Sequence, residues 1–350
     1  MHKTYAIVGS AKPLTDGKLQ YSELNSALTN LGFRESKALD SDYLIFVNYN
    51  KKVFKKFKKL GKIGTKLILI RLEPIAVLPI QYTKKVESVF DLIISPGRKI
   101  TTTQYREFIG WPYRFNFNPS KPNLEKIEIE SVVNQSVRDG LFDYEQWALR
   151  DNALVLIAAN KVSPTSNSNY RIRRRIARSM NKSELNVYGD LWNDTKRQLI
   201  SHRVRIFLFA IRTGYVPNIL EVYGGFFTKY SNFIGKPFNK HDVNKKYKYS
   251  LVIENSDDYC SEKLFDAMIN GSIPIYIGPK NNEINLPDNL YLSCNGSISD
   301  IKNLLASLTQ DQCDGMLNSM KVFLQSDNFL IGWQSEEIYR KIAEKIKGLD

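Results

Sequence analysis

An α/β fold with two Rossmann-like domains facing one cleft is predicted by three features of this 350-residue sequence. The chain exceeds the roughly 250–300 residues at which a single hydrophobic core stops growing. Two separate series of short apolar runs alternate with segments of helical periodicity, the pattern of a mostly parallel sheet. The runs are rich in Ile, Leu and Val, as in strands buried on both faces. Ligands of such sheets bind at the carboxyl ends of the strands, so we expect the site in the cleft.

The first series predicts an amino-terminal domain at residues 1–150. Its strands are expected at 4–9, 42–48, 66–72 and 90–95. Two helices lie between them, and their apolar faces consist of Leu24, Leu28 and Leu31 in one and of Val53, Phe54, Phe57 and Leu60 in the other. Residues 97–146 are more polar and contain several prolines, so we expect them to connect the two domains.

The second series predicts a carboxy-terminal domain at residues 151–330. Its strands are expected at 153–160, 185–189, 250–255, 273–279 and 289–293, with a basic helix near 170–180. The last segment, 331–350, has the apolar spacing of a helix. The pattern leaves open whether this helix packs back on the amino-terminal domain.

The composition predicts a folded protein that is attracted to anions. The apolar fraction of 43% excludes global disorder. The net charge of +14 favours nucleic acid, anionic lipid or a phosphate-bearing substrate without choosing among them. The three cysteines, Cys260, Cys294 and Cys313, have neither paired nor zinc-ligand spacing, which is typical of a reducing compartment. No run approaches the about 20 apolar residues of a membrane span. We therefore expect a cytoplasmic protein.

The segment 246–279 carries the strongest chemical signal. A strand ends in Glu254 and Asn255, and either Asp258 or Ser261 can cap the helix that follows. Glu262 and Lys263 then lie in its first turn, where a lysine is unfavourable by up to about 1 kcal/mol. A bound diphosphate compensates for this, while Glu262 or Glu254 accepts hydrogen bonds from sugar or ribose hydroxyls. The alternative is an ordinary solvated helix start.

This segment, YKYSLVIENSDDYCSEKLFDAMINGSIPIYIGP, resembles the signature of glycosyltransferase family 10, the α1,3/4-fucosyltransferases. The likeness extends upstream to the strand and arginine-rich helix at 157–178 and, more weakly, to the Glu-Pro element at 71–79. It covers roughly residues 66–295, although Ile75 replaces a proline often found there and residues 190–245 have no clear counterpart. The resemblance implies a fold of the GT-B type, with an acceptor-binding domain at 1–150 and a nucleotide-sugar-binding domain at 151–330. The donor-binding residues that it implies are Asn160, Arg171, Tyr249, Glu254, Asn255, Tyr259, Glu262 and Lys263.

The resemblance also implies the reaction, which is inverting transfer of L-fucose from GDP-fucose to a hydroxyl of an oligosaccharide or lipid-linked glycan, as in bacterial surface-glycan synthesis. Glu73 is the candidate base, because it follows a buried strand where burial is expected to raise its pKa. The alternative is a structural carboxylate paired with Arg71 or a neighbouring lysine. Arg171 and Lys263 are expected to neutralise the leaving diphosphate. No Asp-x-Asp motif follows a strand, so we expect neither a metal nor any other cofactor.

Three alternatives are open. The same fold can use another nucleotide sugar, because the loops that contact base and sugar give no recognisable pattern. The basic run at 51–62 could contact an anionic membrane at its inner face, but we prefer the plainer interpretation, a core-packed helix with a solvated lysine face. A protein that only binds membranes or polyanions is the alternative from another class. The run at 171–178 belongs to an amphipathic helix beside the expected nucleotide site, so we expect no nucleic-acid partner.

Overall fold

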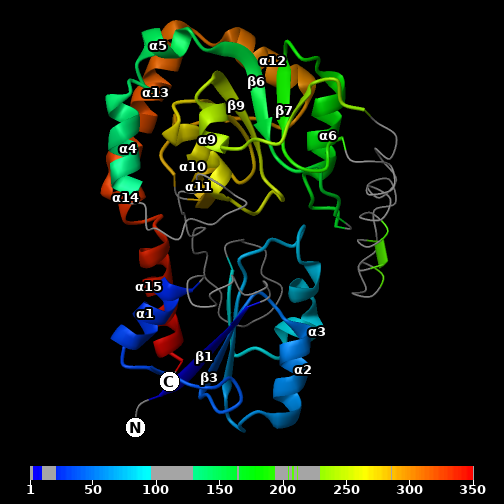
Figure 1. Ribbon diagram of the computed structural model, residues 1–350, viewed down its shortest axis with the longest axis vertical. Coiled ribbons are helices and arrows are strands. Elements are labelled where there is room, and N and C mark those ends of the chain that lie inside the picture. Colours follow the sequence, from blue (N-terminus) through cyan, green and yellow to red (C-terminus); the bar gives the residue numbers. More distant parts are fainter. Residues whose placement is uncertain are drawn as a thin grey trace. The chain divides into compact units, whose positions relative to one another are not determined.

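The computed structural model describes residues 3–9, 21–95, 129–163, 165–193, 229–284 and 286–349, together with positions 204, 207, 208 and 211. The chain forms two compact units (Figure 1). The first unit comprises Met1–Tyr113 and Ile331–Asp350, and the second comprises Arg114–Leu330. Each unit is built around one parallel sheet.

The sheet of the first unit has the strand order β2-β1-β3-β4-β5. Every described pair in it is parallel, with Ile45 of β3 opposite both Ile7 of β1 and Ile68 of β4. The strands are β1 (Thr4–Gly9), β2 (Arg34–Glu35), β3 (Tyr43–Val47), β4 (Lys66–Ile70) and β5 (Leu92–Ile94). All residues of β3 are buried, as expected for a central strand covered on both faces.

Helices cover both faces of this sheet. One face packs against α1 (Ser22–Asn30) and α15 (Ser335–Lys347), which share a core with β1, β3 and β4. The other face packs against α2 (Lys51–Leu60) and α3 (Lys84–Glu87). A 3₁₀ turn, η1 (Pro79–Tyr82), precedes α3. The carboxy-terminal segment thus belongs to the first unit. Its helix buries Ile338, Ile342 and Ile346 at helical spacing.

The sheet of the second unit has the order β11-β10-β9-β6-β7-β8, and its described pairs are also parallel. The strands are β6 (Asp151–Ile157), β7 (Leu185–Tyr188), β8 (Phe233–Gly235), β9 (Tyr247–Ile253), β10 (Ile273–Ile277) and β11 (Leu292–Ser293). One face shares a core with α6 (Tyr170–Ser179) and α12 (Ile298–Ser307).

The other face carries α9 (Lys240–Asn244) and α10 (Glu262–Ile269). Against α10 pack α4 (Ile129–Arg138) and α13 (Gln310–Gln325). The remaining short helices are α5 (Tyr144–Ala148), α11 (Asn281–Ile284) and α14 (Asp327–Leu330). This packing fixes α10, whose first turn lies at the carboxyl edge of the sheet.

The predicted fold class is confirmed, and the predicted strands match the observed ones to within a few residues. The expected domain boundary near residue 150 is wrong. The helices α4 and α5 belong to the second unit, because α4 packs on α10 and α13 and α5 packs on α13. Their buried residues include Ile129, Val133 and Trp147, so this part of the supposed connection is core structure. Residues 96–128 of the same connection lie outside the described residues.

Candidate functional site

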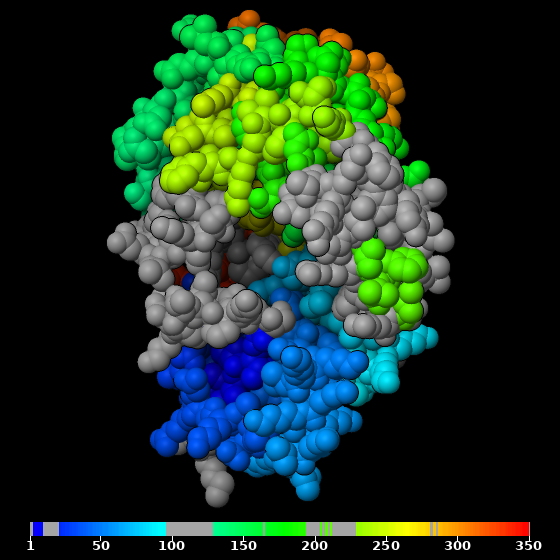
Figure 2. Space-filling model, turned by 45° about the vertical axis from the view of Figure 1, so that its right-hand side comes forward, coloured from blue at the N-terminus to red at the C-terminus, as the bar shows by residue number. Residues whose placement is uncertain are grey.

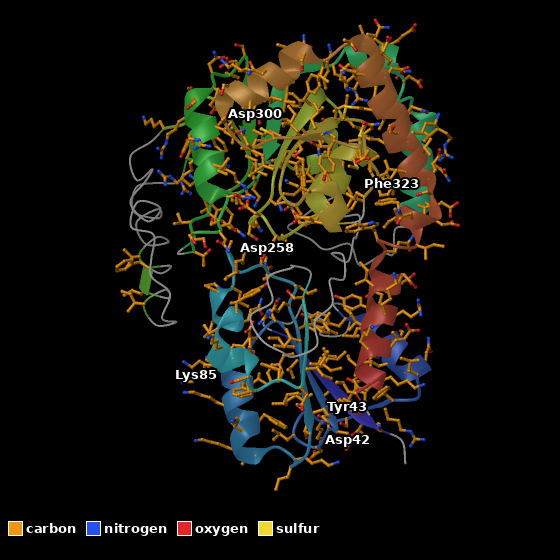
Figure 3. The ribbon with its side chains drawn as sticks, turned by 180° about the vertical axis from the view of Figure 1, so that it is seen from behind. Asp42, Tyr43, Lys85, Asp258, Asp300 and Phe323 are labelled. Carbon is orange, nitrogen blue, oxygen red and sulfur yellow. The ribbon has the colours of Figure 1, made fainter. Side chains whose placement is uncertain are left out.

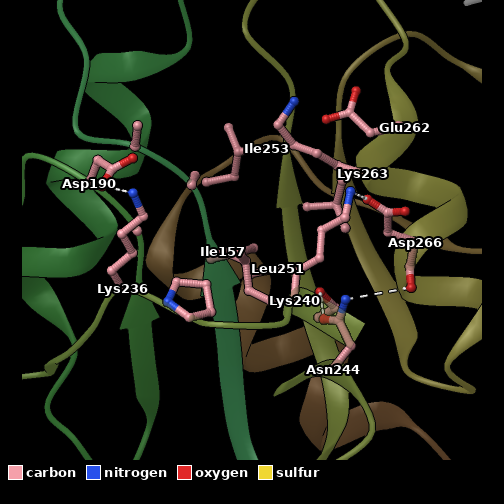
Figure 4. A pocket seen from close by; sticks show the side chains of 16 residues that line it. Ile157, Asp190, Lys236, Lys240, Asn244, Leu251, Ile253, Glu262, Lys263 and Asp266 are labelled. Carbon is pink, nitrogen blue, oxygen red and sulfur yellow. Dashed lines mark hydrogen bonds and ion pairs between the residues drawn. The ribbon is translucent and has the colours of Figure 1, made fainter. Parts of the chain in front are cut away.

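A cavity of about 200 Å³ opens in the second unit at the carboxyl edge of its sheet (Figure 4). Its walls come from the carboxyl ends of β6 and β7, from residues 250–253 of β9, from α9 and from the first turns of α10. Several wall residues are apolar and small or flat, among them Ala158, Ala159 and Pro237. Apolar walls with a few charged groups are typical of a small-molecule site.

Charged groups of both signs line this cavity. Lys236 pairs with Asp190 at 3.2 Å, and Lys240 pairs with the buried carboxylate of Asp266 (Figure 4). Burial lowers the pKa of Lys240, but the charges of Asp266 and Glu262 more than offset this, so that its pKa is raised. The lining therefore remains charged at neutral pH.

Glu262 is the carboxylate that faces the cavity from the start of α10. Burial raises the pKa of Glu262, but the positive charges of Lys263 and Lys240 outweigh burial and lower its pKa overall. Glu262 is therefore ionised at neutral pH and can accept hydrogen bonds from hydroxyl groups.

Hydrogen bonds and an ion pair with Glu254 hold the first turn of α10. Ser261 is the N-cap, as one of the two predictions had it, and its side chain accepts a hydrogen bond from the backbone nitrogen of Lys263. The backbone nitrogen and hydroxyl of Ser261 donate to Glu254 at 2.8 and 2.7 Å. The ammonium of Lys263 donates to the Ser261 hydroxyl at 2.7 Å and lies 3.6 Å from Glu254. Glu254 is fully buried, so it holds this turn, and Glu262 is the better placed of the two carboxylates for a ligand.

Asn255, which was predicted to bind the donor, is held by an arginine that the sequence analysis did not single out. Arg173 of α6 is 2% exposed, and its guanidinium donates to the carbonyl of Ile253 and, at 2.9 Å, to Asn255 Oδ1. It also lies 4.9 Å from the centre of the Tyr170 ring. Burial lowers the pKa of Arg173. The side chain therefore fixes the carboxyl end of β9.

Arg171, by contrast, is exposed on α6. Two residues along a helix point to nearly opposite sides, so Arg171 and Arg173 cannot share a face. The buried stripe of Tyr170, Arg173 and Ala177 has spacings of three and four, and this periodicity was the signal for Arg173.

Asn160 and Tyr259, two further predicted residues, are both buried near the carboxyl edge. The Asn160 amide nitrogen donates to the carbonyl of Leu191 at 3.3 Å, whereas its Oδ1 has no partner among the described residues. A buried acceptor of this kind can take a hydrogen bond from a ligand. The adjacent strand end requires Gly189, which has φ +135° and at which a Cβ atom would lie 2.3 Å from the carbonyl oxygen of Ala158.

Tyr249, which was predicted to bind the donor, is not among the residues that line the cavity. Tyr249 lies four residues, about 13 Å, before the carboxyl end of β9. Its ring packs edge-on against Trp147 at 5.4 Å, and its hydroxyl is 3.7 Å from the sulfur of Cys313. Burial raises its pKa. Tyr249 is partly buried and packs against Trp147 and Cys313, whereas the next residues of β9, from Ser250 to Ile253, line the cavity.

In the first unit, Glu73 follows β4 in a segment held by side chains. The backbone nitrogens of Leu72 and Glu73 donate to Asn48 Oδ1 at 2.9 and 3.1 Å. The Glu73 carbonyl accepts from Gln81 Nε2 at 2.7 Å and from the Tyr82 hydroxyl at 2.9 Å. Gln81 is fully buried and also accepts from the backbone nitrogen of Tyr49 at 3.2 Å. The backbone of Glu73 is therefore fixed at the carboxyl edge of the first sheet.

Arg71 has a carboxylate partner other than the one considered in the sequence analysis. Arg71 and Glu87 are each 1% exposed and form an ion pair at 2.7 Å. The guanidinium also donates to the carbonyl of Gln81 and stacks 4.2 Å from the centre of the Tyr82 ring. This ion pair supports the same two residues that hold Glu73.

The sequence of the second unit matches a known family. Residues 217–314 match the family described as glycosyltransferase family 10 (fucosyltransferase) C-term. A fucosyltransferase-like protein of Arabidopsis thaliana is 39% identical over 66 residues, which are 18% of this chain and 12% of that protein. The match thus spans about an eighth of the length of that relative. These findings confirm the predicted resemblance over this segment.

Solved structures share the fold. The crystal structure of Anabaena Alr3699/HepE in complex with UDP-glucose has a TM-score of 0.55 and 9% identity, covering 99% of this chain and 100% of that one. A crystal structure of α1,3-fucosyltransferase with GDP-fucose has a TM-score of 0.45 and 13% identity, covering 99% of this chain and 90% of that one. The likeness to HepE shows a common fold of the GT-B type.

Proposed function

Because residues 217–314 belong to glycosyltransferase family 10, we propose that the chain is a fucosyltransferase that moves L-fucose from GDP-fucose to an oligosaccharide hydroxyl. The observation that carries the proposal is the start of α10, which lies within the family match. Lys263 and Glu262 stand there side by side at a cavity of about 200 Å³. A diphosphate needs a cation at the amino end of a helix, and a ribose needs the carboxylate.

The donor is held by the second unit in this proposal. The diphosphate lies at the amino end of α10, where Lys263 and the positive end of the helix dipole stabilise its charge. Glu262 accepts hydrogen bonds from hydroxyls of the ribose. The apolar walls at 157–159 and Pro237 bind the flat base. Glu254, Ser261 and Arg173 act indirectly, by holding the turn on which the ligand rests.

The first unit supplies the base. As the acceptor oxygen bonds to the anomeric carbon, its proton passes to the carboxylate of Glu73, and the bond from that carbon to the diphosphate oxygen breaks. Attack opposite the leaving group inverts the configuration. Support for Glu73 comes from its fixed backbone, because a catalytic group must be held in place to be effective.

We further propose that the reaction needs no metal, because Lys263 and the positive end of the α10 dipole can neutralise the leaving diphosphate. Arg171, which is exposed at the first turn of α6, stays a prediction for the same role. The three cysteines are buried thiols, which favours a reducing, cytoplasmic location. No helix of the described residues has the length and apolarity to span a bilayer. An acceptor in bacterial surface-glycan synthesis, either free or lipid-linked, fits such a location.

A different nucleotide sugar is the second candidate donor. The Anabaena protein with the same fold was crystallised with UDP-glucose, so the fold does not specify the base. Titrating the chain with GDP-fucose, GDP-mannose and UDP-glucose separates the two, because our proposal requires GDP-fucose to bind most tightly.

The test of activity follows GDP release from GDP-fucose in excess chelator, with N-acetyllactosamine-type and lipid-linked acceptors. Wild type is compared with Glu73→Gln and Lys263→Ala. The matched controls are Glu145→Gln and Lys182→Ala, which change exposed residues of the same types. We expect acceptor-dependent release that both site variants lose by at least about 100-fold and both controls keep. Full activity of Glu73→Gln would exclude Glu73 as the base, and release only with added metal would exclude metal independence.

A further inference from the structure

A second surface of the chain has features that the transfer reaction does not use. Between residues 51 and 66 the sequence contains eight lysines and no acidic residue. Six of these lysines belong to α2, where all of them are exposed. Together with Lys84 and Lys85 of α3 they form what we call the lysine face.

The two helices that carry the lysine face belong to one layer. Val53, Phe54 and Phe57 of α2 pack in the same core as Val86 of α3, so both helices lie on one side of the sheet. Figure 2 shows α2 on the surface of the first unit, in blue, and Figure 3 shows Lys85 on the outer side of its helix. The core needs only the three apolar residues of α2, and the lysines are left for solvent or a partner.

Two apolar residues are exposed beside these charges. Leu60, the last residue of α2, is 64% exposed, and Ile63 in the following turn is 98% exposed. Single exposed apolar residues are common, but these two are three positions apart and follow Lys58 and Lys59 in the sequence, while Lys62 between them pairs with Asp42. Cations around an apolar tip are the pattern of a segment that lies in a bilayer interface.

The residue types of the lysine face favour an anionic bilayer over a nucleic acid as the partner. The cations at 51–66 are all lysines, which act as point charges and lack the planar fork with which arginine binds phosphate. The aromatic residues of α2 face the core, so no ring is presented for stacking on bases. Long lysine stems can lie along an apolar surface while their charges reach headgroups, and Leu60 and Ile63 can enter it.

We propose that the lysine face, with Leu60 and Ile63, docks the chain on the surface of an anionic lipid bilayer. The helix is about 15 Å long, so its lysines span several headgroups. Docking of this kind goes beyond the proposed transfer reaction and requires neither donor nor acceptor. It places the enzyme where a lipid-linked acceptor would be found.

The test is co-sedimentation of the full chain, without donor, with vesicles of phosphatidylcholine alone or with about one third phosphatidylglycerol, at about 0.1 M and 1 M salt. We expect binding to the anionic vesicles at low salt only. Lys55→Gln/Lys59→Gln should bind about 30-fold more weakly, because each lysine near the surface contributes about fivefold. Leu60→Asn/Ile63→Asn should lose about tenfold or more.

Two control variants alter matched residues of the second unit. Leu149→Asn changes a side chain that is 88% exposed, and Lys182→Gln/Lys246→Gln removes two exposed lysines. We expect both to bind as wild type does. Absence of binding to anionic vesicles, or an equal loss in the controls, would overturn the proposal. The proposal would also be overturned if Leu60→Asn/Ile63→Asn bound the vesicles as tightly as wild type and RNA displaced them. The lysine face would then bind soluble polyanions.

Discussion

Replacing Glu87 by Gln tests whether the buried ion pair under the Glu73 segment stabilises the first unit. Glu87 and Arg71 are each 1% exposed and 2.7 Å apart. The substitution keeps the shape of the side chain and removes its charge, so that the guanidinium of Arg71 stays buried without a countercharge. Breaking one partner of a buried pair costs about 3–5 kcal/mol. A typical protein has only about 5–15 kcal/mol of stability, so this is a large part of it.

Urea denaturation followed by circular dichroism measures the loss, and hydrogen exchange of the β4 amides assigns it to the first unit. The matched control is Glu184→Gln, which breaks the exposed pair of Glu184 with Lys302, also at 2.7 Å. That pair is expected to contribute about 0–1 kcal/mol. The double variant Arg71→Met/Glu87→Leu should recover most of the loss, because no unpaired charge remains. A loss below about 1 kcal/mol for Glu87→Gln, similar to the control, would refute the reasoning.

Three further predictions concern the site itself. Asn48→Ala should lower kcat of GDP release by about 10-fold or more, with a smaller change in KM, because Asn48 holds the backbone at Glu73. An effect on KM alone would contradict this role of Asn48. Tyr249→Phe should keep activity within about threefold of wild type, since the ring packs in the core; a loss of GDP affinity would return Tyr249 to the site. The lowered pKa of Glu262 contributes stability that is complete above the ordinary carboxyl pKa of 4.5 and is lost as the pH falls below it. Glu262→Gln should therefore flatten the acid side of the stability profile, and an unchanged profile would exclude Glu262 as its source.

The fold followed from the sequence because its strands are buried on both faces. Runs such as KLILIRL and SLVIEN are apolar at successive positions, which separates them from the helices between them. The predicted domain boundary was wrong because the apolar pattern is less regular over residues 97–146. The helices α4 and α5 have apolar residues of their own, but their place in the second unit depends on contacts with α10 and α13 that are distant in sequence.

The start of α10 was predictable for a different reason. An N-cap residue followed by a carboxylate and a lysine marks a helix start from neighbouring residues alone. Ser261, Glu262 and Lys263 lie at the start of α10 as the sequence indicated. Glu254 differs because the sequence gives its place at the strand end but not its partner. Only the folded turn brings Ser261 back onto that carboxylate.

Two arginines of α6 rest on different arguments, and Arg171 stays a prediction of the resemblance. The family pattern singled out Arg171, whereas helical periodicity alone places Arg173 on the buried stripe with Tyr170. For Tyr249, the sequence placed the residue in the right strand, but the distance to the carboxyl end decides which groups it can touch. Position along a strand therefore needs the same attention as the face of the strand.

The central claim is that the start of α10 binds a nucleoside diphosphate, and calorimetric titration with GDP tests it most directly. Wild type is compared with Lys263→Ala and with Lys182→Ala, whose lysine is exposed elsewhere in the second unit. We predict that GDP binds to wild type and to Lys182→Ala alike, and about 10–100-fold more weakly to Lys263→Ala, because a cation that contacts a diphosphate contributes about 1.5–3 kcal/mol. Equal affinity of all three proteins, or no binding of GDP to any of them, would contradict the account.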